Sequence, residues 1–469
     1  MNQIDLAFTS ALEQAKLIRE RQISPLELVE IYLARIERLN PQVGSFFHLA
    51  ADAAISEAKA KTEFLANNQD LCNLPLFFGV PTAIKDLNAV AGMPCSYGVA
   101  ALKDNIVNYD DGVVTRIKQA GLIILGKTAT SQLGSFPYTE PPNFEPARTP
   151  WNLDYTAGGS SGGAASAVAA GLCALAQGSD GGGSIRGPAL CCGLVGIKPA
   201  RGRISNAPIG DFQSGIATNG PLARTVADAA AFLDVMSGYT TGDPYWLPEP
   251  KMSFLAATGE DVGQLRIAFS PSLAGFPESV PIVGQAVRET AKRLEEMGHI
   301  VEEGCFNVEG LLEPFKIVWQ SGVAAAGIPL ELLCPLNQWL GEQQTSAGQY
   351  LQAVRTLQMI SRSLVAFFQE YDVLVLPVYL HQAIRIGEWE NLPPQETLEK
   401  MINWVAPCPP CNASGLPAIT IPTGFDENGL PIAVQLVGGA ADEITLIALA
   451  AQLEALNPWS HYRPAMATA

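Results

Sequence analysis

The chain has few basic side chains and very few histidines. Its 469 residues include 29 Lys and Arg against 46 Asp and Glu, which gives a net charge of −17, and only four histidines. A negative field of this size repels phosphate backbones, so we expect no direct contact with nucleic acid. None of the histidines lies in a glycine-rich or otherwise unusual context, and His299 is expected to be structural.

A disulfide framework, a zinc site and a membrane span are not indicated either. The nine cysteines form an odd, scattered set, and the C-x-x-C pair of Cys408 and Cys411 has no second pair nearby. The longest apolar run, 164–176, is short for a bilayer span and consists mostly of small residues, which predicts a closely packed interior helix. Residues 1–20 contain no apolar segment after a basic start, so we expect no signal peptide. We therefore expect a soluble protein of the cytoplasm that contacts no membrane and holds no metal or cofactor.

The order of helical and short apolar segments predicts an α/β fold. Hydrophobic residues make up 48% of the chain and charged residues 16%, so a large core can form. A capping box from Ser24 to Glu27 predicts a helix that ends at Asn40–Pro41. Further helices are expected at 113–120, at 283–297 and from Asp442 onward. Short buried strands are expected at 76–80, 82–85, 122–125, 265–270, 299–301, 371–377, 418–422 and 432–437.

These segments predict one large α/β/α domain, with a mixed central sheet covered by helices. Residues 1–65 would form N-terminal helices, residues 66–245 the core that carries the candidate chemistry, and residues 401–469 the last strands and helix. Residues 310–400 are mostly helical, with breaks at Pro329 and Pro335, which indicates a helical insertion that walls a pocket.

Two serines, Ser160 and Ser184, each lie within a cluster of glycines. Glycine lets backbone N–H groups come close to a ligand and adopts φ values that other residues resist. A serine in such a segment presents its hydroxyl beside backbone donors. The nucleophile and the oxyanion hole are two of the three parts of an acyl-transfer site. The third part is a base, which another segment of the chain has to supply.

Lys85 is the stronger candidate for that base. It ends the apolar segment 82–85, where burial of the ammonium would lower its pKa from about 10.4. An amine shifted toward neutrality can accept a proton from a hydroxyl. The alternative from local sequence is a surface lysine that snorkels or pairs with a carboxylate.

An α/β-hydrolase is a competing interpretation of the same region. Gly159 to Gly163 matches the pattern G-x-S-x-G with Ser161 as the nucleophile, and Asp372 and His461 would complete the triad. That fold requires a strand before the serine, and residues 152–156 are a poor strand.

Several motifs occur in order along the chain. The central ones are Gly158–Gly163, Ser179–Arg186 and Cys192–Pro199, with Gly79–Asp86 upstream and Asn412–Ala418 and Gly429–Gln435 downstream. In these motifs the chain resembles the amidase signature family, and the resemblance covers almost its whole length. The sequence departs from the family's usual pattern at a few positions, among them Gly181, where a threonine or another side chain is common.

The resemblance implies a Ser-Ser-Lys catalytic triad. Ser184 would be the nucleophile and Lys85 the base, and Ser160, which a cis peptide bond holds in this family, would pass the proton between them. The resemblance also implies supporting residues: Gly181, Gly182 and Gly183 with the N–H of Ser184 as the oxyanion hole, Asp180 paired with Arg186, and Ser161 beside the site.

The implied activity is that of an amidohydrolase, which cleaves a carboxylic amide C–N bond through a Ser184 acyl-enzyme and releases a carboxylate with ammonia or an amine. Substrate contacts in the family come from the segment before the first serine and from the helical insertion, here Ser135, Phe136, Tyr138, Trp319 and Ser321. These segments are aromatic and apolar with few fixed charges, so we expect a small uncharged or amphiphilic amide. Residues 138–142 and 149–153 look most like the branch that contains 6-aminohexanoate cyclic-dimer hydrolases.

Two alternatives keep the same scaffold. The A subunit of glutamyl-tRNA amidotransferases shares the triad, but it needs partner proteins and charged tRNA, and its tyrosine-rich segment before the final strands is not found here. A binding protein on a decayed amidase scaffold is the other, although all three triad positions are intact. The sequence leaves open whether the chain forms a homodimer.

Overall fold

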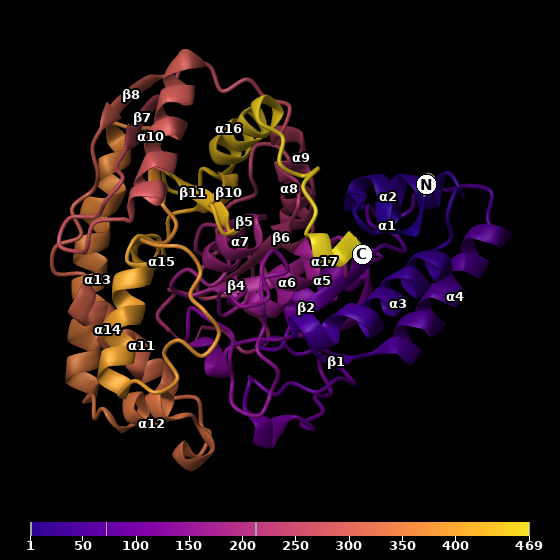
Figure 1. The fold of residues 1–469 in the computed structure, drawn as a ribbon, viewed down its shortest axis with the longest axis horizontal. Helices are drawn as coiled ribbons and strands as arrows, with labels where there is room; N and C mark the ends of the chain where they lie inside the picture. Colours follow the sequence, from indigo (N-terminus) through magenta and orange to yellow (C-terminus); the bar gives the residue numbers. More distant parts are fainter. Residues whose placement is uncertain (1, 72, 212, 469) are drawn as a thin grey trace.

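A mixed β-sheet covered by helices forms the centre of the molecule (Figure 1). The computed structural model describes residues 2–71, 73–211 and 213–468. In this part of the chain the strands form an 11-stranded sheet in the order β1-β3-β2-β4-β6-β5-β10-β11-β9-β7-β8. The predicted α/β class, with a mixed sheet under helices, is confirmed.

The strands follow the order of short apolar segments in the sequence. They are β1 (Phe46–Leu49), β2 (Pro81–Lys85), β3 (Ile123–Thr128), β4 (Leu175–Asp180), β5 (Val195–Lys198), β6 (Thr218–Ala223), β7 (Arg266–Phe269), β8 (Ile300–Glu303), β9 (Val373–Pro377), β10 (Ala418–Phe425) and β11 (Pro431–Gly438). β2 is parallel to β3 and β4, and β7 is parallel to β8 and β9, while β4 and β6 pair in antiparallel fashion. β2 and β9 are buried along their whole length, as strands covered on both faces are.

Helices flank the sheet in several groups. They are α1 (Gln3–Ala7), α2 (Ala11–Arg19), α3 (Pro25–Val43), α4 (Ala51–Asn67), α5 (Gly112–Gln119), α6 (Gly162–Ala169), α7 (Arg186–Cys192), α8 (Val226–Met236), α9 (Phe254–Ala257), α10 (Pro281–Glu296), α11 (Leu312–Ala324), α12 (Pro335–Glu342), α13 (Ala347–Ala366), α14 (Pro394–Val405), α15 (Pro409–Ser414), α16 (Glu443–Leu456) and α17 (Ala465–Thr468). Short 3₁₀ turns lie at Ala100–Leu102, Gln132–Gly134, Leu330–Leu332 and Phe367–Gln369. Figure 1 shows α11 to α14 together on one side of the molecule and α1 to α4 on the other. Within the described ranges, no helix combines the length and the apolar character that crossing a bilayer requires.

The helical region 310–400 is interrupted by one strand of the sheet. Helices α11, α12 and α13 leave the sheet, and the chain then returns as β9, which pairs with β11 and β7. It leaves the sheet again as α14. The helices α11, α12 and α14 therefore stand beside the sheet's carboxyl-end loops, where they can wall a cavity.

The apolar run 164–176 does not form the single helix that was predicted. Helix α6 ends at Ala169, Gly171 adopts a left-handed conformation with φ of 65°, and β4 begins at Leu175. All residues of α6 are buried, and a Cβ added at Gly163 would collide with backbone atoms of Ala129. The small residues of the run thus serve close packing, while the glycine that follows them reverses the chain.

Two element boundaries also differ from the prediction. Residues 76–79 form a turn instead of a strand, and the strand begins only at Pro81. Helix α3 has the predicted capping box at Ser24, but it continues through Pro41 and ends at Gly44, whose φ is 60°. A left-handed glycine is a common end of a helix, and it outweighed the proline as the stop signal here.

The two ends of the described chain lie side by side (Figure 1). Arg463 forms an ion pair with Asp5 at 2.7 Å. The guanidinium of the buried Arg35 on α3 donates to the carbonyl of Ala467 at 2.9 Å. The last helix is therefore fastened to the first ones.

Candidate active site

Segments distant in the sequence meet where the neighbouring strands β2 and β4 end. Lys85 is the last residue of β2, and Ser179 is the residue before the end of β4. Because β2 and β4 are parallel, their carboxyl ends lie at the same edge of the sheet. Ser160 lies just before α6 and Ser184 just before α7, in the loops at this edge. Loops at the carboxyl ends of parallel strands are the usual place for a binding site.

Lys85 is fully buried, and its amine contacts two serines. Its Nζ lies 2.7 Å from Oγ of Ser160, 3.0 Å from Oγ of Ser179 and 3.4 Å from the Ser179 carbonyl oxygen. Burial lowers the pKa of Lys85 from 10.5 to about 7, and the negative charge of Asp180 opposes only part of this shift. Much of the amine is therefore neutral near pH 7, as a general base requires. The alternative of a surface lysine is wrong.

Ser179 is a site residue that the sequence analysis missed. A neutral amine has two N–H donors and one lone pair. The Ser179 carbonyl can only accept a hydrogen bond, and the Ser179 hydroxyl can accept a second one from Lys85 Nζ. When both donors point to Ser179, the lone pair of Lys85 points toward Ser160. The signal was the position of Ser179 inside the Ser179–Arg186 motif, but its side-chain direction is visible only in three dimensions.

Backbone contacts hold the turn that carries Ser160. The Gly159–Ser160 peptide bond is cis, as the resemblance implied. The hydroxyl of the buried Ser161 donates to the carbonyl of Ser179 at 3.1 Å and accepts from the N–H of Ser179 at 3.2 Å. Ser161 therefore ties the turn to β4, and its hydroxyl is engaged in a structural contact.

The hydroxyl of Ser184 is unengaged. Ser184 is only 6% exposed, yet it lines two cavities, and no hydrogen bond to its Oγ occurs within the ranges that the structure describes. Ser160 lines one of the same cavities, but the Ser160 and Ser184 hydroxyls are not hydrogen-bonded to each other. Of the expected relay, the link between Lys85 and Ser160 is formed and the link between Ser160 and Ser184 is open.

The glycine loop before Ser184 offers fewer backbone donors than expected. The N–H of Gly183 donates to Oδ1 of Asp180 at 2.8 Å, so it is already engaged. The N–H groups of Gly181, Gly182 and Ser184 have no acceptor among the described residues. The donors available to an oxyanion are therefore these three, and Gly183 is a correction to the expected set.

A buried ion pair fixes the same loop. Nη2 of Arg186 lies 3.0 Å from Oδ1 of Asp180, and both side chains are inaccessible to solvent. Burial alone would raise the pKa of Asp180, but the Arg186 guanidinium outweighs it and lowers that pKa. The remaining Arg186 donors reach the carbonyl of Cys408 and the side-chain oxygens of Gln435 and Asn412, so the buried guanidinium is satisfied.

A row of amide side chains connects the backbone of Lys85 to an aspartate. Oε1 of Gln177 accepts from the N–H of Lys85 at 2.9 Å, and Nε2 of Gln177 donates to Oδ1 of Asn88 at 2.9 Å. Nδ2 of Asn88 then donates to Oδ2 of Asp111 at 3.0 Å. The sequence analysis named none of these three residues, because nothing in their local sequence indicates that they meet.

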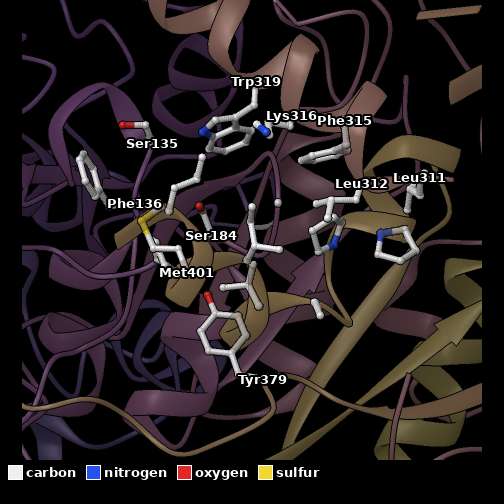
Figure 2. Close-up of a pocket in the computed structure, with 18 of the residues that line it drawn as sticks. Ser135, Phe136, Ser184, Leu311, Leu312, Phe315, Lys316, Trp319, Tyr379 and Met401 are labelled. Carbon is white, nitrogen blue, oxygen red and sulfur yellow. The ribbon is translucent and has the colours of Figure 1, made fainter. Parts of the chain in front are cut away.

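Two cavities of opposite character meet at Ser184. The first has a volume of about 100 Å³ and is lined by aromatic and aliphatic side chains, with Lys316 as its only charged residue among those described. Figure 2 shows the Ser184 hydroxyl at its centre, with Trp319 on one side and Met401 and Tyr379 on the other. The second has a volume of about 410 Å³ and is lined by Ser160, Ser179 and further polar side chains. We call them the apolar cavity and the polar cavity.

Three of the five predicted substrate contacts line the apolar cavity. They are Ser135, Phe136 and Trp319, and Ser135 and Trp319 also line the polar cavity. Helix α14 adds residues that the sequence analysis did not name, among them Met401 and Val405.

The other two predicted contacts lie outside both cavities. Tyr138 packs edge-on against Phe136 and Trp389, with ring centroids 5.4 and 5.6 Å away. Ser321 is two residues beyond Trp319, which places it on another face of α11, and its hydroxyl donates to the carbonyl of Ile317 at 2.7 Å. Both are structural contacts, and the prediction for them is corrected.

Trp319 also explains the unusual glycine at position 181. A Cβ built on Gly181 would lie 3.3 Å from Cζ3 of Trp319, which is tighter than ordinary van der Waals contact. The indole therefore takes space that a side chain at position 181 would need. The glycine and the tryptophan together shape the entrance to the nucleophile.

The histidine-based alternative is not assembled in this fold. His461 is exposed and packs against Tyr462 with ring centroids 4.0 Å apart. Asp372 is exposed and accepts from the N–H of Arg266 at 2.8 Å. Neither residue contacts Ser161, so they cannot activate it. His299 accepts from the N–H of Leu265 at 3.2 Å, a structural contact.

Comparison with known proteins identifies the family. The family model for amidases matches residues 27–447. A protein of Synechocystis sp., provisionally named an amidase, is 58% identical over 96% of this chain and 89% of its own length. An acylamidase of Rhodococcus erythropolis is 31% identical over 99% of each chain. The chain belongs to the amidase family and is an amide-hydrolysing enzyme.

Solved structures agree with this assignment. The structure of 6-aminohexanoate cyclic dimer hydrolase with substrate superposes with a TM-score of 0.92 at 29% identity and covers 98% of this chain and 99% of that one. The amidase-like subunit of the glutamyl-tRNA(Gln) amidotransferase of Thermotoga maritima superposes with a TM-score of 0.79 at 27% identity, covering 97% and 96%. The expected likeness to the cyclic-dimer hydrolases is confirmed, and the amidotransferase alternative has less support.

Proposed function

We propose that this enzyme hydrolyses its amide through an acyl-enzyme on Ser184, with Ser160 passing protons between Ser184 and Lys85. The observation that carries the proposal is the 2.7 Å contact between the buried Lys85 amine and the Ser160 hydroxyl. A lysine whose pKa burial lowers to about 7 is suited to accept a proton and return it in the same catalytic cycle.

The proposed steps balance as follows. Lys85 takes the proton of Ser160, Ser160 takes that of Ser184, and Ser184 Oγ bonds to the amide carbon. The oxyanion then faces the free N–H groups of Gly181, Gly182 and Ser184. The C–N bond breaks as the proton returns along the same path to the leaving nitrogen. A water molecule repeats the sequence on the ester and releases the carboxylate.

One movement is needed before the first step. The Ser160 and Ser184 hydroxyls have to come within hydrogen-bond distance, and rotation of the Ser184 side chain toward the polar cavity would achieve this. Such contacts are often open in the absence of substrate and tighten when it binds. Both hydroxyls face the same cavity, which supports this movement.

The cavities suggest how the substrate is oriented. Ser160 lines only the polar cavity, and the leaving nitrogen has to receive its proton from Ser160. We therefore place the amine half of the amide in the polar cavity and the acyl half in the apolar one. Phe136, Phe315 and Trp319 in the apolar cavity suit a small aromatic or aliphatic acyl group.

No partner protein, nucleic acid, metal or cofactor enters this mechanism. Among the described residues, no group of three or more His, Cys, Asp or Glu side chains is arranged to hold a metal ion. The described cysteines are free thiols, which supports the cytoplasm as the proposed compartment.

Substitution of the three proposed catalytic residues tests the mechanism. Ser184→Ala and Lys85→Ala should each lower kcat by about 10³-fold or more, whereas His461→Ala should leave it unchanged. A fluorophosphonate probe should label Ser184 in the wild type and not in Ser184→Ala. If His461→Ala abolishes turnover and Lys85→Ala is mild, the proposed relay is wrong. Ammonia release from glutamine without activity on other amides would instead support the amidotransferase alternative.

A further inference from the structure

The charged side chains of the polar cavity are all acidic. Among its described lining residues, Asp111 and Asp211 are the only ones that carry a charge. The chain as a whole has a net charge of −17. A cavity with walls of low polarizability concentrates the field of such charges, so this one attracts cations and repels anions.

Asp111 is placed to bind a ligand. It directly precedes α5, yet its side chain makes no capping hydrogen bond to that helix. Its Oδ2 accepts from Nδ2 of Asn88 and from the N–H of Ala89, each at 3.0 Å. Its Oδ1 has no hydrogen-bond partner within residues 2–71, 73–211 and 213–468. The carboxylate is thus held by one oxygen and leaves the other for an outside donor.

The neighbours of Asp111 in the cavity favour a cation as well. Tyr97 and Tyr109 line the same cavity and offer aromatic rings, whose faces attract ammonium groups. Asp211 adds a second carboxylate, which the N–H groups of Gln213 and Gly215 hold at 3.3 and 2.8 Å. Burial raises the pKa of Asp111, and an ammonium bound to it would favour its ionised form.

We infer that the amine half of the substrate carries a second amino group, positively charged, which binds Asp111. The preferred substrates are then monoacylated diamines, with a small apolar acyl group and a cationic tail. This inference rests on the proposed function, because it places the leaving nitrogen in the polar cavity. Hydrolysis converts such an amide and one water into a carboxylate and a doubly protonated diamine.

The same charges disfavour the opposite substrate. An amide whose amine half ends in a carboxylate would bring a negative charge toward Asp111 and Asp211. Amides built from ω-amino acids, in their open-chain form, have this unfavourable arrangement. The inference therefore predicts an order of preference by tail charge, with cationic tails best and anionic tails worst.

A matched substrate set tests this order. Acetyl, hexanoyl and benzoyl amides would be made with ethylenediamine, diaminobutane and diaminohexane, with uncharged alkylamines of equal length, and with ω-amino acids of equal length. We expect kcat/KM of the wild type for at least one diamine amide to exceed that of its uncharged counterpart by about fivefold to tenfold, the effect of one partly solvated ion pair. The advantage should shrink as the ionic strength rises from about 0.01 M to about 1 M.

Two variants separate this role from a structural one. Asp111→Asn keeps an acceptor for Asn88 and Ala89, and it should remove most of the preference for the cationic tail through a higher KM. Its rate on the uncharged amides should stay close to that of the wild type. Asp110→Asn is the matched control, since Asp110 is the adjacent carboxylate and pairs with Lys118 at 2.8 Å outside the cavity lining. It should keep the preference. Asp211→Asn should weaken the preference less than Asp111→Asn, and it serves if Asp111→Asn does not fold.

The outcomes distinguish the two proposals. If the uncharged amides are cleaved as fast as the diamine amides at every length, the inference about the tail is overturned and the proposed function stands. An equal loss for both substrate types in Asp111→Asn would also overturn it. If no amide is cleaved and Ser184 is not labelled by a fluorophosphonate, both are overturned together.

Discussion

Replacing Lys85 with methionine should remove a pH-dependent loss of stability. The pKa of Lys85 is lowered from 10.5 to about 7 in the folded protein because the amine is buried. Above about pH 10.5, the amine is neutral in both the folded and the unfolded chain, and the shift has no effect. As the pH falls from there toward 7, the unfolded chain binds a proton that the folded chain does not bind. The folded state therefore loses stability over this window.

The size of the effect follows from this shift. One proton bound by the unfolded state alone changes the free energy of unfolding by about 1.4 kcal/mol per pH unit. Between about pH 7.5 and 9.5, the wild type should gain roughly 3 kcal/mol relative to Lys85→Met. Below pH 7 the difference should become constant. Ser160 and Ser179 lose a partner in the variant, which adds an offset of about 1–3 kcal/mol that does not depend on pH.

Urea unfolding, followed by tryptophan fluorescence at a series of pH values, measures this difference. Lys198 provides a matched control, because it is also buried, its Nζ donates only to the carbonyl of Pro199 among the described residues, and burial lowers its pKa to about 8. The difference for Lys198→Met should therefore begin about one pH unit higher. Parallel curves for the wild type and Lys85→Met would show that Lys85 keeps its proton in the folded state, and the relay would then have no base.

The same geometry makes the catalytic rate sensitive to pH and to two neighbours of the triad. The value of kcat/KM should rise with pH and level off above about 7, the pKa of Lys85; a profile that is flat from about pH 5 to 9 would contradict a lysine base. Ser179→Ala should lower kcat by about tenfold to a hundredfold with little change in KM, and Ser179→Thr, which keeps the hydroxyl, should recover most of the rate. Gly181→Thr should slow turnover by about tenfold, because its side chain meets Trp319, and Trp319→Ala in the same chain should restore part of the rate. Steady-state kinetics on one hydrolysed amide measures all three, and a loss in Gly181→Thr that Trp319→Ala leaves unchanged would refute the steric explanation.

Local sequence signals predicted the elements whose cause is local. The capping box at Ser24 starts α3 as expected, and the apolar segment at 371–377 contains β9. The burial of Lys85 could also be predicted, because a lysine at the end of an apolar strand has little access to water. In each case the deciding contacts lie within a few residues of the signal.

Other features depend on directions that the sequence does not record. Ser321 belongs to the expected segment, but the turn of α11 points it away from the cavity that Trp319 lines. Gly183 was expected to donate to an oxyanion, and the Asp180 carboxylate takes its N–H instead. The contact between Ser179 and Lys85 joins residues on two different strands. Such contacts arise from the pairing of β2 with β4, which no single segment specifies.

The supports of Arg186 have a consequence for the order in which the protein matures during synthesis. Its partners Asn412 and Gln435 follow it by 226 and 249 positions in the chain. While the ribosome is still making the intervening segment, the arginine beside the nucleophile lacks the oxygens that hold it. The growing polypeptide therefore stays inert toward amides until the codon for Gln435 has been translated and the last strands have joined the sheet.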